Sequence, residues 1–195
     1  MYLTYADHFR PMDKQRVLLY ELTLLLIGSL FIALTAQVSI RIGPVPITGQ
    51  TMGVLLVGML YGSKRGAATL LLYVIEGAAG LPVFAGGTSG LTVLAGPTGG
   101  YLVGFIPAAF VVGWLAERGW DRSFGLTAVA MLIGNAVIYL FGLSRLGFLL
   151  GYENMLAYGF LPFWPGDLLK IIVAAGLLPA GWKLLDKLGL DQRIG

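Results

Sequence analysis

Cysteine is absent from this chain, and histidine occurs once, at His8. Without cysteine there is no disulfide framework, no thiolate nucleophile and no cysteine-ligated metal. A single histidine near the N-terminus disfavours a histidine metal centre and a serine–histidine catalytic pair. The sequence also lacks a GxxxxGK[ST] phosphate loop, so ATP-driven transport would need its ATPase on another chain.

Charged residues are scarce as well. They make up 12% of the 195 residues, whereas 57% are hydrophobic. A soluble surface needs roughly 25–35% charged residues. The composition therefore predicts an integral membrane protein surrounded by lipid. The net charge of +3 is too small and too dispersed to indicate nucleic acid as a partner.

Residues 1–16 are polar and contain no apolar h-region, so they do not resemble a cleavable signal peptide. We expect them to form a solvated or interfacial leader. Residues 17–195 are expected to form a single membrane domain, since apolar segments follow one another from there onward.

Six apolar segments predict an all-α fold with six transmembrane helices. At 1.5 Å per residue, about 20 residues cross roughly 30 Å of hydrocarbon. The second segment is short, which indicates a tilted, re-entrant or shielded helix. The expected spans are 17–40, 50–62, 66–79, 101–115, 124–143 and 167–185.

The cations are distributed unevenly between the two sides of such a bundle. Ten of the 13 Lys and Arg residues fall on the side of the termini, and three on the other. This bias predicts that both termini are cytoplasmic. The ten are Arg10, Lys14, Arg16, Lys64, Arg65, Arg118, Arg122, Lys183, Lys187 and Arg193, against Arg41, Arg145 and Lys170.

A polar motif, WPGDLLK, opens the last span on the external side. Asp167 and Lys170 are three residues apart, so a helix places both on one face. Charges near hydrocarbon are disfavoured by roughly 2.5–3.5 kcal/mol, so they usually face a partner, a cavity or a ligand. The alternative is an ion pair at the interface, satisfied by itself, with Lys170 extending outward.

Two further external segments have unusual compositions. Residues 81–100 contain six glycines and no charge, which predicts an ordered lid over a ligand; tight turns over helix ends are the alternative. Residues 41–49, RIGPVPITG, predict a rigid turn-forming loop, because proline fixes φ and removes a donor.

These features favour binding over catalysis. An acid and an amine side by side suit a neutral polar ring such as a urea or an amide. Hydroxyls from Thr48, Thr88 and Tyr101 and an apolar wall from Phe84 would complete such a site. Asn135, within the fifth span, could bond either the ligand or a neighbouring helix.

Two other functions remain open. One is an intramembrane enzyme that uses Glu76 and Asp167 as acid and base on a lipid-like substrate, although nothing fixes their separation. The other is an assembly subunit whose external polar residues only pack. Ser29 and Ala33, four apart in the first span, permit close approach of a helix from this chain or from another.

The runs GPVPITGQT, GLPVFAGGTSG, GPTGGY and PFWPGDLLK resemble the BioY family, the biotin-capturing S components of energy-coupling factor (ECF) transporters. The resemblance covers residues 29–185. It implies a six-helix protein of the bacterial cytoplasmic membrane, without enzymatic activity or cofactor. Such a protein holds biotin under its external loops and associates with a transmembrane T component and paired ATPases.

By the same resemblance, Asp167 and Lys170 would bind the ureido ring of biotin, and Ser29 and Ala33 would meet the T component. Two positions depart from the family pattern: Thr88 stands where some relatives have Asn, and Leu102 where some have Arg. Arg41 is the substitute candidate for the biotin carboxylate. Other positions that match the pattern are Gln50, Tyr101, Gly86 and Gly87.

Overall fold

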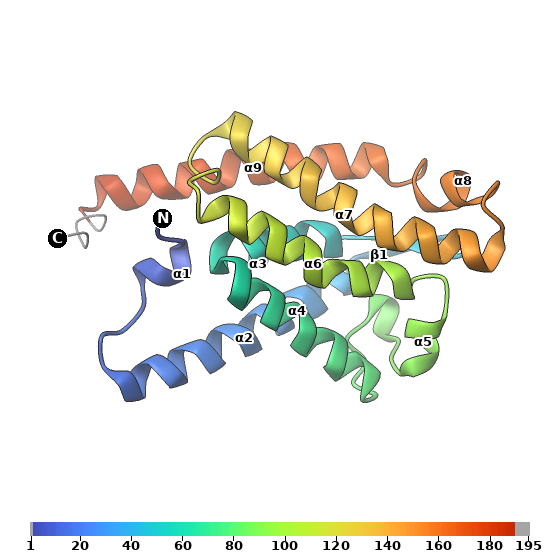
Figure 1. Ribbon diagram of the computed structural model, residues 1–195, viewed down its shortest axis with the longest axis horizontal. Helices are drawn as coiled ribbons and strands as arrows, with labels where there is room; N and C mark the ends of the chain where they lie inside the picture. Colours follow the sequence, from blue (N-terminus) through green and yellow to red (C-terminus); the bar gives the residue numbers. More distant parts are fainter. Residues whose placement is uncertain (1, 190–195) are drawn as a thin grey trace.

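The computed structural model describes residues 2–189 and is a helical bundle with one short hairpin (Figure 1). Residues 190–195, which include Arg193 and the end of the expected membrane domain, lie outside this range. The elements are α1 (Tyr5–His8), α2 (Lys14–Gln37), β1 (Ser39–Ile42), β2 (Val45–Thr48), α3 (Gln50–Tyr61), α4 (Ser63–Ala78), η1 (Ala85–Gly87), α5 (Leu91–Ala95), α6 (Gly99–Ala116), α7 (Phe124–Leu150), α8 (Met155–Gly159) and α9 (Trp164–Lys187).

The long helices run between two ends of the molecule that differ in character. Helix α1 and the last turns of α9 lie at one end, whereas the hairpin, α5 and α8 lie toward the other (Figure 1). The described start and end of the chain are therefore on the same side of the bundle, as an even number of crossings requires.

Four helical segments are long and apolar enough to cross a membrane: 14–37, 99–116, 124–150 and 155–187, the last of which joins α8 to α9. Helices α3 and α4 have 12 and 16 residues, which correspond to about 18 and 24 Å. Both are shorter than the roughly 30 Å of hydrocarbon. The helical fold class is confirmed, but the structure supports four crossings by length and not the six expected.

The proline-rich segment folds as an antiparallel β-hairpin, which the sequence did not predict. Strands β1 and β2 pair from Ser39↔Thr48 to Ile42↔Val45, and Gly43 in the turn has φ +80°. Pro46 is tolerated because each strand of a two-stranded sheet has a free edge. The hairpin takes over the end of the expected first span, so α2 stops at Gln37.

Helix α7 extends seven residues beyond its expected end at residue 143 and includes Arg145. Polar side chains within this extension bond to backbone carbonyls: Ser144 donates to Leu140 O at 2.6 Å, and Arg145 donates to Ala95 O. Because their hydrogen bonds are satisfied there, these residues do not end the helix.

The first half of the N-terminal leader packs against the bundle, whereas most of residues 9–16 are exposed. Thr4, Ala6 and His8 are only 0%, 4% and 8% exposed. Thr4 and Asp7 form a reciprocal capping box that starts α1, and this short helix packs against the bundle. Residues 4–8 of the leader thus pack with the membrane domain.

Close backbone contacts fix α3 against its neighbours. A Cβ at Gly58 would lie 2.6 Å from Ala109 O on α6, and one at Gly66 on α4 would lie 2.9 Å from Gly58 Cα. Only glycine allows this separation. Helices α3, α4 and α6 are therefore closely packed on one another. The first residues of α3, Gln50 and Thr51, follow the hairpin and lie at the hairpin end of the molecule.

Candidate functional site

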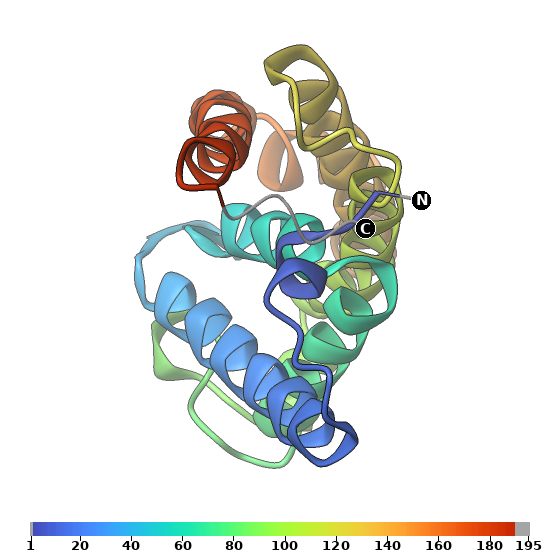
Figure 2. The same ribbon diagram turned by 90° about the vertical axis from the view of Figure 1, so that its left-hand side faces the viewer.

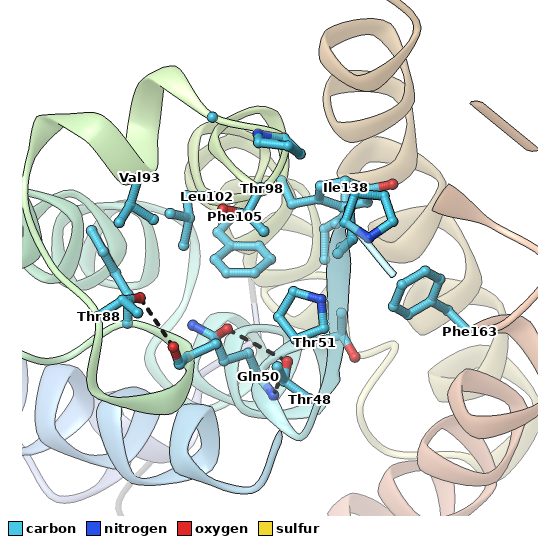
Figure 3. A pocket seen from close by; sticks show the side chains of 18 of the residues that line it. Thr48, Gln50, Thr51, Thr88, Val93, Thr98, Leu102, Phe105, Ile138 and Phe163 are labelled. Atoms are coloured by element: carbon cyan, nitrogen blue, oxygen red, sulfur yellow. Dashed lines mark hydrogen bonds between the residues drawn. The ribbon is translucent and has the colours of Figure 1, made fainter. Parts of the chain in front are cut away.

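A pocket of about 360 Å³ opens at the end of the bundle that carries the hairpin and the lid segment. Apolar side chains form its walls, including Leu102, Phe105, Ile138 and Phe163 (Figure 3). Its polar groups come from the hairpin, α3, the lid segment, α7 and α9. A concave, largely apolar site with a few converging polar groups is typical of small-molecule binding.

The Asp167–Lys170 pair lies in this pocket. Lys170 Nζ is 3.0 Å from Asp167 Oδ1, and it also donates to Thr48 O at 2.8 Å and to Thr51 Oγ1 at 2.9 Å. Asp167 is 4% exposed. It sits in the first turn of α9, where the positive end of the helix dipole favours a carboxylate. The two charged groups have their hydrogen-bond partners within the protein, as in the alternative of a self-satisfied ion pair. However, both residues line the pocket.

Two residues that hold Asp167 were not identified from the sequence. Thr51 Oγ1 donates to Asp167 Oδ1 at 3.1 Å, and Tyr139 Oη donates a short hydrogen bond to Asp167 Oδ2. The sequence makes Asn135, in the fifth span, a candidate ligand contact, and Tyr139 lies on the same face of that helix, α7. However, Asn135 lies one turn away, buried and outside the residues that line the pocket.

Gln50 connects the floor of the pocket to the lid segment. Its Nε2 donates to Tyr73 Oη at 2.6 Å, and Tyr73 Oη donates to Val83 O at 2.9 Å. Thr48 Oγ1 donates to Gln50 Oε1 at 3.5 Å (Figure 3). These hydrogen bonds fix the orientation of the Gln50 side chain in the absence of a ligand.

The segment 81–100 contains two short helices, η1 and α5, rather than an extended loop. Phe84 is its anchor: it is 1% exposed and packs edge-on against Tyr73 with ring centroids 5.6 Å apart. Gly86 and Gly87 have φ of +66° and +71°, so both require glycine, but they are exposed and do not line the pocket. They shape the turn that carries Phe84 and Thr88.

Thr88 and Tyr101 both line the pocket, but their hydroxyls already have partners. Thr88 Oγ1 donates to Ala85 O at 3.0 Å, and Tyr101 Oη donates to Gly159 O at 2.9 Å. The Tyr101 ring therefore serves as wall, and each hydroxyl can still accept one hydrogen bond.

Arg41 projects from β1 at the rim of the pocket. It is exposed, and it makes no hydrogen bond or ion pair with the part of the chain that the structure describes. Among the described lining residues, Arg41 and Lys170 are the cations and Asp167 is the acid. The pocket thus carries one positive charge that is not compensated.

Glu76 does not join this site. Ser29 Oγ donates a short hydrogen bond to Glu76 Oε2, and Glu76 is not among the pocket residues. The structure therefore does not support the alternative in which Glu76 and Asp167 act together as acid and base. Ser29 and Ala33 are 1% and 8% exposed, so the small-residue face of α2 packs inside the bundle.

Within residues 2–189, no three His, Asp or Glu side chains are grouped so that they could hold a metal ion. The polar groups of the pocket are carboxylate, ammonium, guanidinium, amide and hydroxyl. Such a set can recognise a neutral polar ring and an anion at two separate places.

Comparisons with known proteins agree on one family. The BioY family profile matches residues 11–187. A protein from Rhizobium etli, described as biotin transporter BioY, is 39% identical over 160 residues, covering 77% of this chain and 86% of the relative. A Thermotoga maritima protein of the same description is 43% identical over 145 residues, covering 74% and 85%.

A crystal structure is similar over most of its length. It is described as the S-component for biotin from an ECF-type ABC transporter, and it superposes with a TM-score of 0.77 at 28% sequence identity. The match covers 89% of this chain and 95% of that chain.

Proposed function

The chain belongs to the BioY family, and from this premise we propose that it is the biotin-binding membrane subunit of an uptake transporter. The observation that carries the proposal is the preorganised Asp167–Lys170 pair inside an apolar pocket of about 360 Å³. Biotin combines a neutral ureido ring, an aliphatic chain and a carboxylate. The pocket offers a complementary group for each.

The ureido ring is assigned to the α9 pair. Its carbonyl accepts from Lys170 Nζ in place of one of the three acceptors that this ammonium has in the structure, and one ring N–H donates to Asp167, which Thr51 and Tyr139 keep in place. These hydrogen bonds involve charged groups, so each contributes about 1.5–3 kcal/mol. Phe84, Phe105 and Ile138 enclose the ring and the chain.

The carboxylate is assigned to Arg41. The position of the family arginine holds Leu102 here, and Leu102 is 4% exposed in the pocket wall. Arg41 is the cation at the rim without a partner among the described residues, so a monoanionic ligand would balance the charge of the lining. Guanidinium and carboxylate match in a bidentate geometry.

The topology follows from the same proposal. Six crossings result if α3 and α4 cross as a pair of short helices shielded by α2 and α6. Both termini then face the cytoplasm of a bacterial cytoplasmic membrane, and the pocket opens outward. A T component and a pair of ATPases on other chains supply the energy. Because Ser29 and Ala33 are buried, their contact with the T component requires α2 to move from α4.

Ligand-dependent stability of the purified protein tests the function. A ligand at 100 times its dissociation constant adds about 2.7 kcal/mol to the folded state. We expect biotin to raise the melting temperature, and riboflavin and thiamine to leave it unchanged.

Asp167→Asn and Lys170→Ala should each weaken biotin binding by about 10- to 100-fold, since each removes one charged hydrogen bond. Asp13→Asn and Lys14→Ala, at the opposite end of the molecule, are the matched controls and should bind normally. Unchanged affinity in both α9 variants would show that the site is elsewhere.

A further inference from the structure

The leader spans the end of the bundle opposite the pocket. Figure 2 views the molecule from this end, where α1 lies in front of α3. Tyr5 Oη donates to Leu178 O at 2.5 Å, and the rings of Tyr5 and Trp182 lie 4.2 Å apart. The guanidinium of Arg122 lies over Trp182 at 4.2 Å and over Tyr2 at 5.0 Å. These contacts bind the leader to α9 and to the α6–α7 connection.

A charge cluster binds the same leader to α2 and α4. Arg65 on α4 contacts Asp7 Oδ1 at 2.6 Å and both oxygens of Glu21 on α2 at 2.6 and 2.9 Å. Tyr20 Oη donates to Ala6 O at 2.7 Å. Burial disfavours the charged form of Asp7, but hydrogen bonds from Arg65 and Thr4 outweigh it and lower the pKa of the carboxyl. Asp7 is therefore ionised at neutral pH.

Helix α2 needs this attachment more than its neighbours do. It is the least buried of the four long apolar segments in the described chain, and it packs chiefly on α3 and α4, whereas α9 packs chiefly on α7. Between the leader and the hairpin, α2 is a 24-residue rod, about 36 Å long. The leader joins its free end to α9.

The other end of α2 belongs to the pocket. One residue, Val38, separates α2 from β1, which carries Arg41 into the pocket rim. Gln37 Nε2 donates to Phe84 O in the lid segment at 3.3 Å, and Gly49 N donates to Val38 O at 3.0 Å. A displacement of α2 would therefore move both the hairpin and the anchor of the lid.

We propose that the leader is a latch. While it ties α2 to α9, it holds the hairpin and the lid segment in the positions that bind the ligand tightly, and its release lets α2 shift and weakens ligand binding. The inference rests on the proposed function, because biotin is the ligand whose affinity the latch controls. Residues 2–10, which form most of the latch, precede the segment matched by the family profile. The same transition would uncover the small-residue face of α2.

Linkage makes this proposal testable, since a latch that strengthens biotin binding must itself be strengthened by biotin. The chain has no cysteine, so Ala6→Cys introduces a single thiol within the latch, at a position that is 4% exposed. Met12→Cys, at a position 98% exposed, is the labelling control. The full-length protein is purified in detergent and treated with a maleimide, with and without biotin.

We expect biotin to slow labelling of A6C by about tenfold and to leave M12C unaffected. Adding Asp7→Asn, which removes the ion pair with Arg65, should raise the labelling rate of A6C and raise the dissociation constant for biotin by a similar factor. Asp13→Asn, at an exposed carboxylate near the same end, is the control and should change neither quantity.

Tyr5→Phe is the milder variant in case Asp7→Asn fails to fold. It keeps the ring contact with Trp182 and loses only the bond to Leu178 O, so smaller shifts in the same direction are expected. If the wild-type protein binds biotin but neither Asp7→Asn nor Tyr5→Phe changes the dissociation constant or the A6C labelling rate, the latch proposal is wrong. If the wild-type protein binds no biotin, the proposed function and the coupling fail together.

Discussion

At the scale of single residues, the proposed site depends on the groups that hold Asp167 and Lys170 in place. Thr51 donates to Asp167 and accepts from Lys170, while Tyr139 occupies the second oxygen of Asp167. Buried polar networks are costly when one member is removed, because the remaining groups lose their partners. The energetic importance of Asp167 and Lys170 is therefore shared with two residues that need not touch biotin.

Thr51→Val tests this dependence, since valine keeps the shape and removes the hydroxyl. The loss of two hydrogen bonds should cost about 1–3 kcal/mol of binding free energy, or about 5- to 150-fold in affinity. Isothermal titration with biotin measures the effect. Thr92→Val, at an exposed lining residue, serves as the control and should bind within about twofold of wild type. An unaffected T51V would mean that Asp167 and Lys170 position each other without help.

Arg41 is the residue that we propose to recognise the biotin carboxylate. The wild-type protein should bind biotin more tightly than the neutral biotin amide, and Arg41→Gln should remove most of this preference while leaving affinity for the amide unchanged. A bidentate guanidinium–carboxylate pair at the rim suggests a preference of about tenfold. Competition binding with the two compounds measures it. Equal discrimination in R41Q would place the carboxylate partner elsewhere.

At the scale of elements, the aromatic anchor of the lid segment, Phe84, packs against a glycine, Gly77. The Phe84 ring occupies the space that a Cβ at Gly77 would need, with atoms 2.1–2.6 Å from that position. Phe84 also contacts Tyr73, which bonds Gln50. The position of the whole lid segment therefore depends on the absence of a side chain at Gly77.

Gly77→Ala should displace Phe84 and loosen the lid segment. Overpacking of this kind costs typically 1–3 kcal/mol, so we expect a lower melting temperature and at least tenfold weaker biotin binding. Gly176→Ala is the matched control, because nothing lies within 4 Å of its Cβ position on α9. Normal biotin binding by G77A would show that Phe84 does not hold the lid segment.

At the scale of the whole molecule, the cation distribution and the positions of α1 and α9 predict one orientation in the membrane, with both termini in the cytoplasm. The cysteine-free chain allows a direct test in intact cells with a membrane-impermeant thiol reagent. Leu91→Cys, at an exposed position in the lid segment, should be labelled from outside. Met12→Cys should react only after the cells are opened. The reverse pattern would place the pocket on the cytoplasmic side.

The sequence predicted much of the architecture because apolar length and charge placement are local properties. The bounds of α3 and α6 agree with the expected spans within two residues, and Asp167 and Lys170 lie on one helical face as their spacing required. The hairpin was missed because two prolines indicate a turn but do not reveal that the flanking residues pair. The extension of α7 was missed because Arg145 finds its acceptor 50 residues away in the chain.

The sequence by itself determined that this protein is a helical membrane protein with an acid–amine pair at the start of its last helix, since composition and 3.6-residue periodicity suffice for both. Only the tertiary structure decided which side chains meet. It brought Thr51 and Tyr139 to Asp167, placed Glu76 and Asn135 outside the pocket lining, and packed residues 4–8 of the leader against the bundle. These outcomes depend on contacts between distant segments, and the pattern along any one segment does not specify its partner.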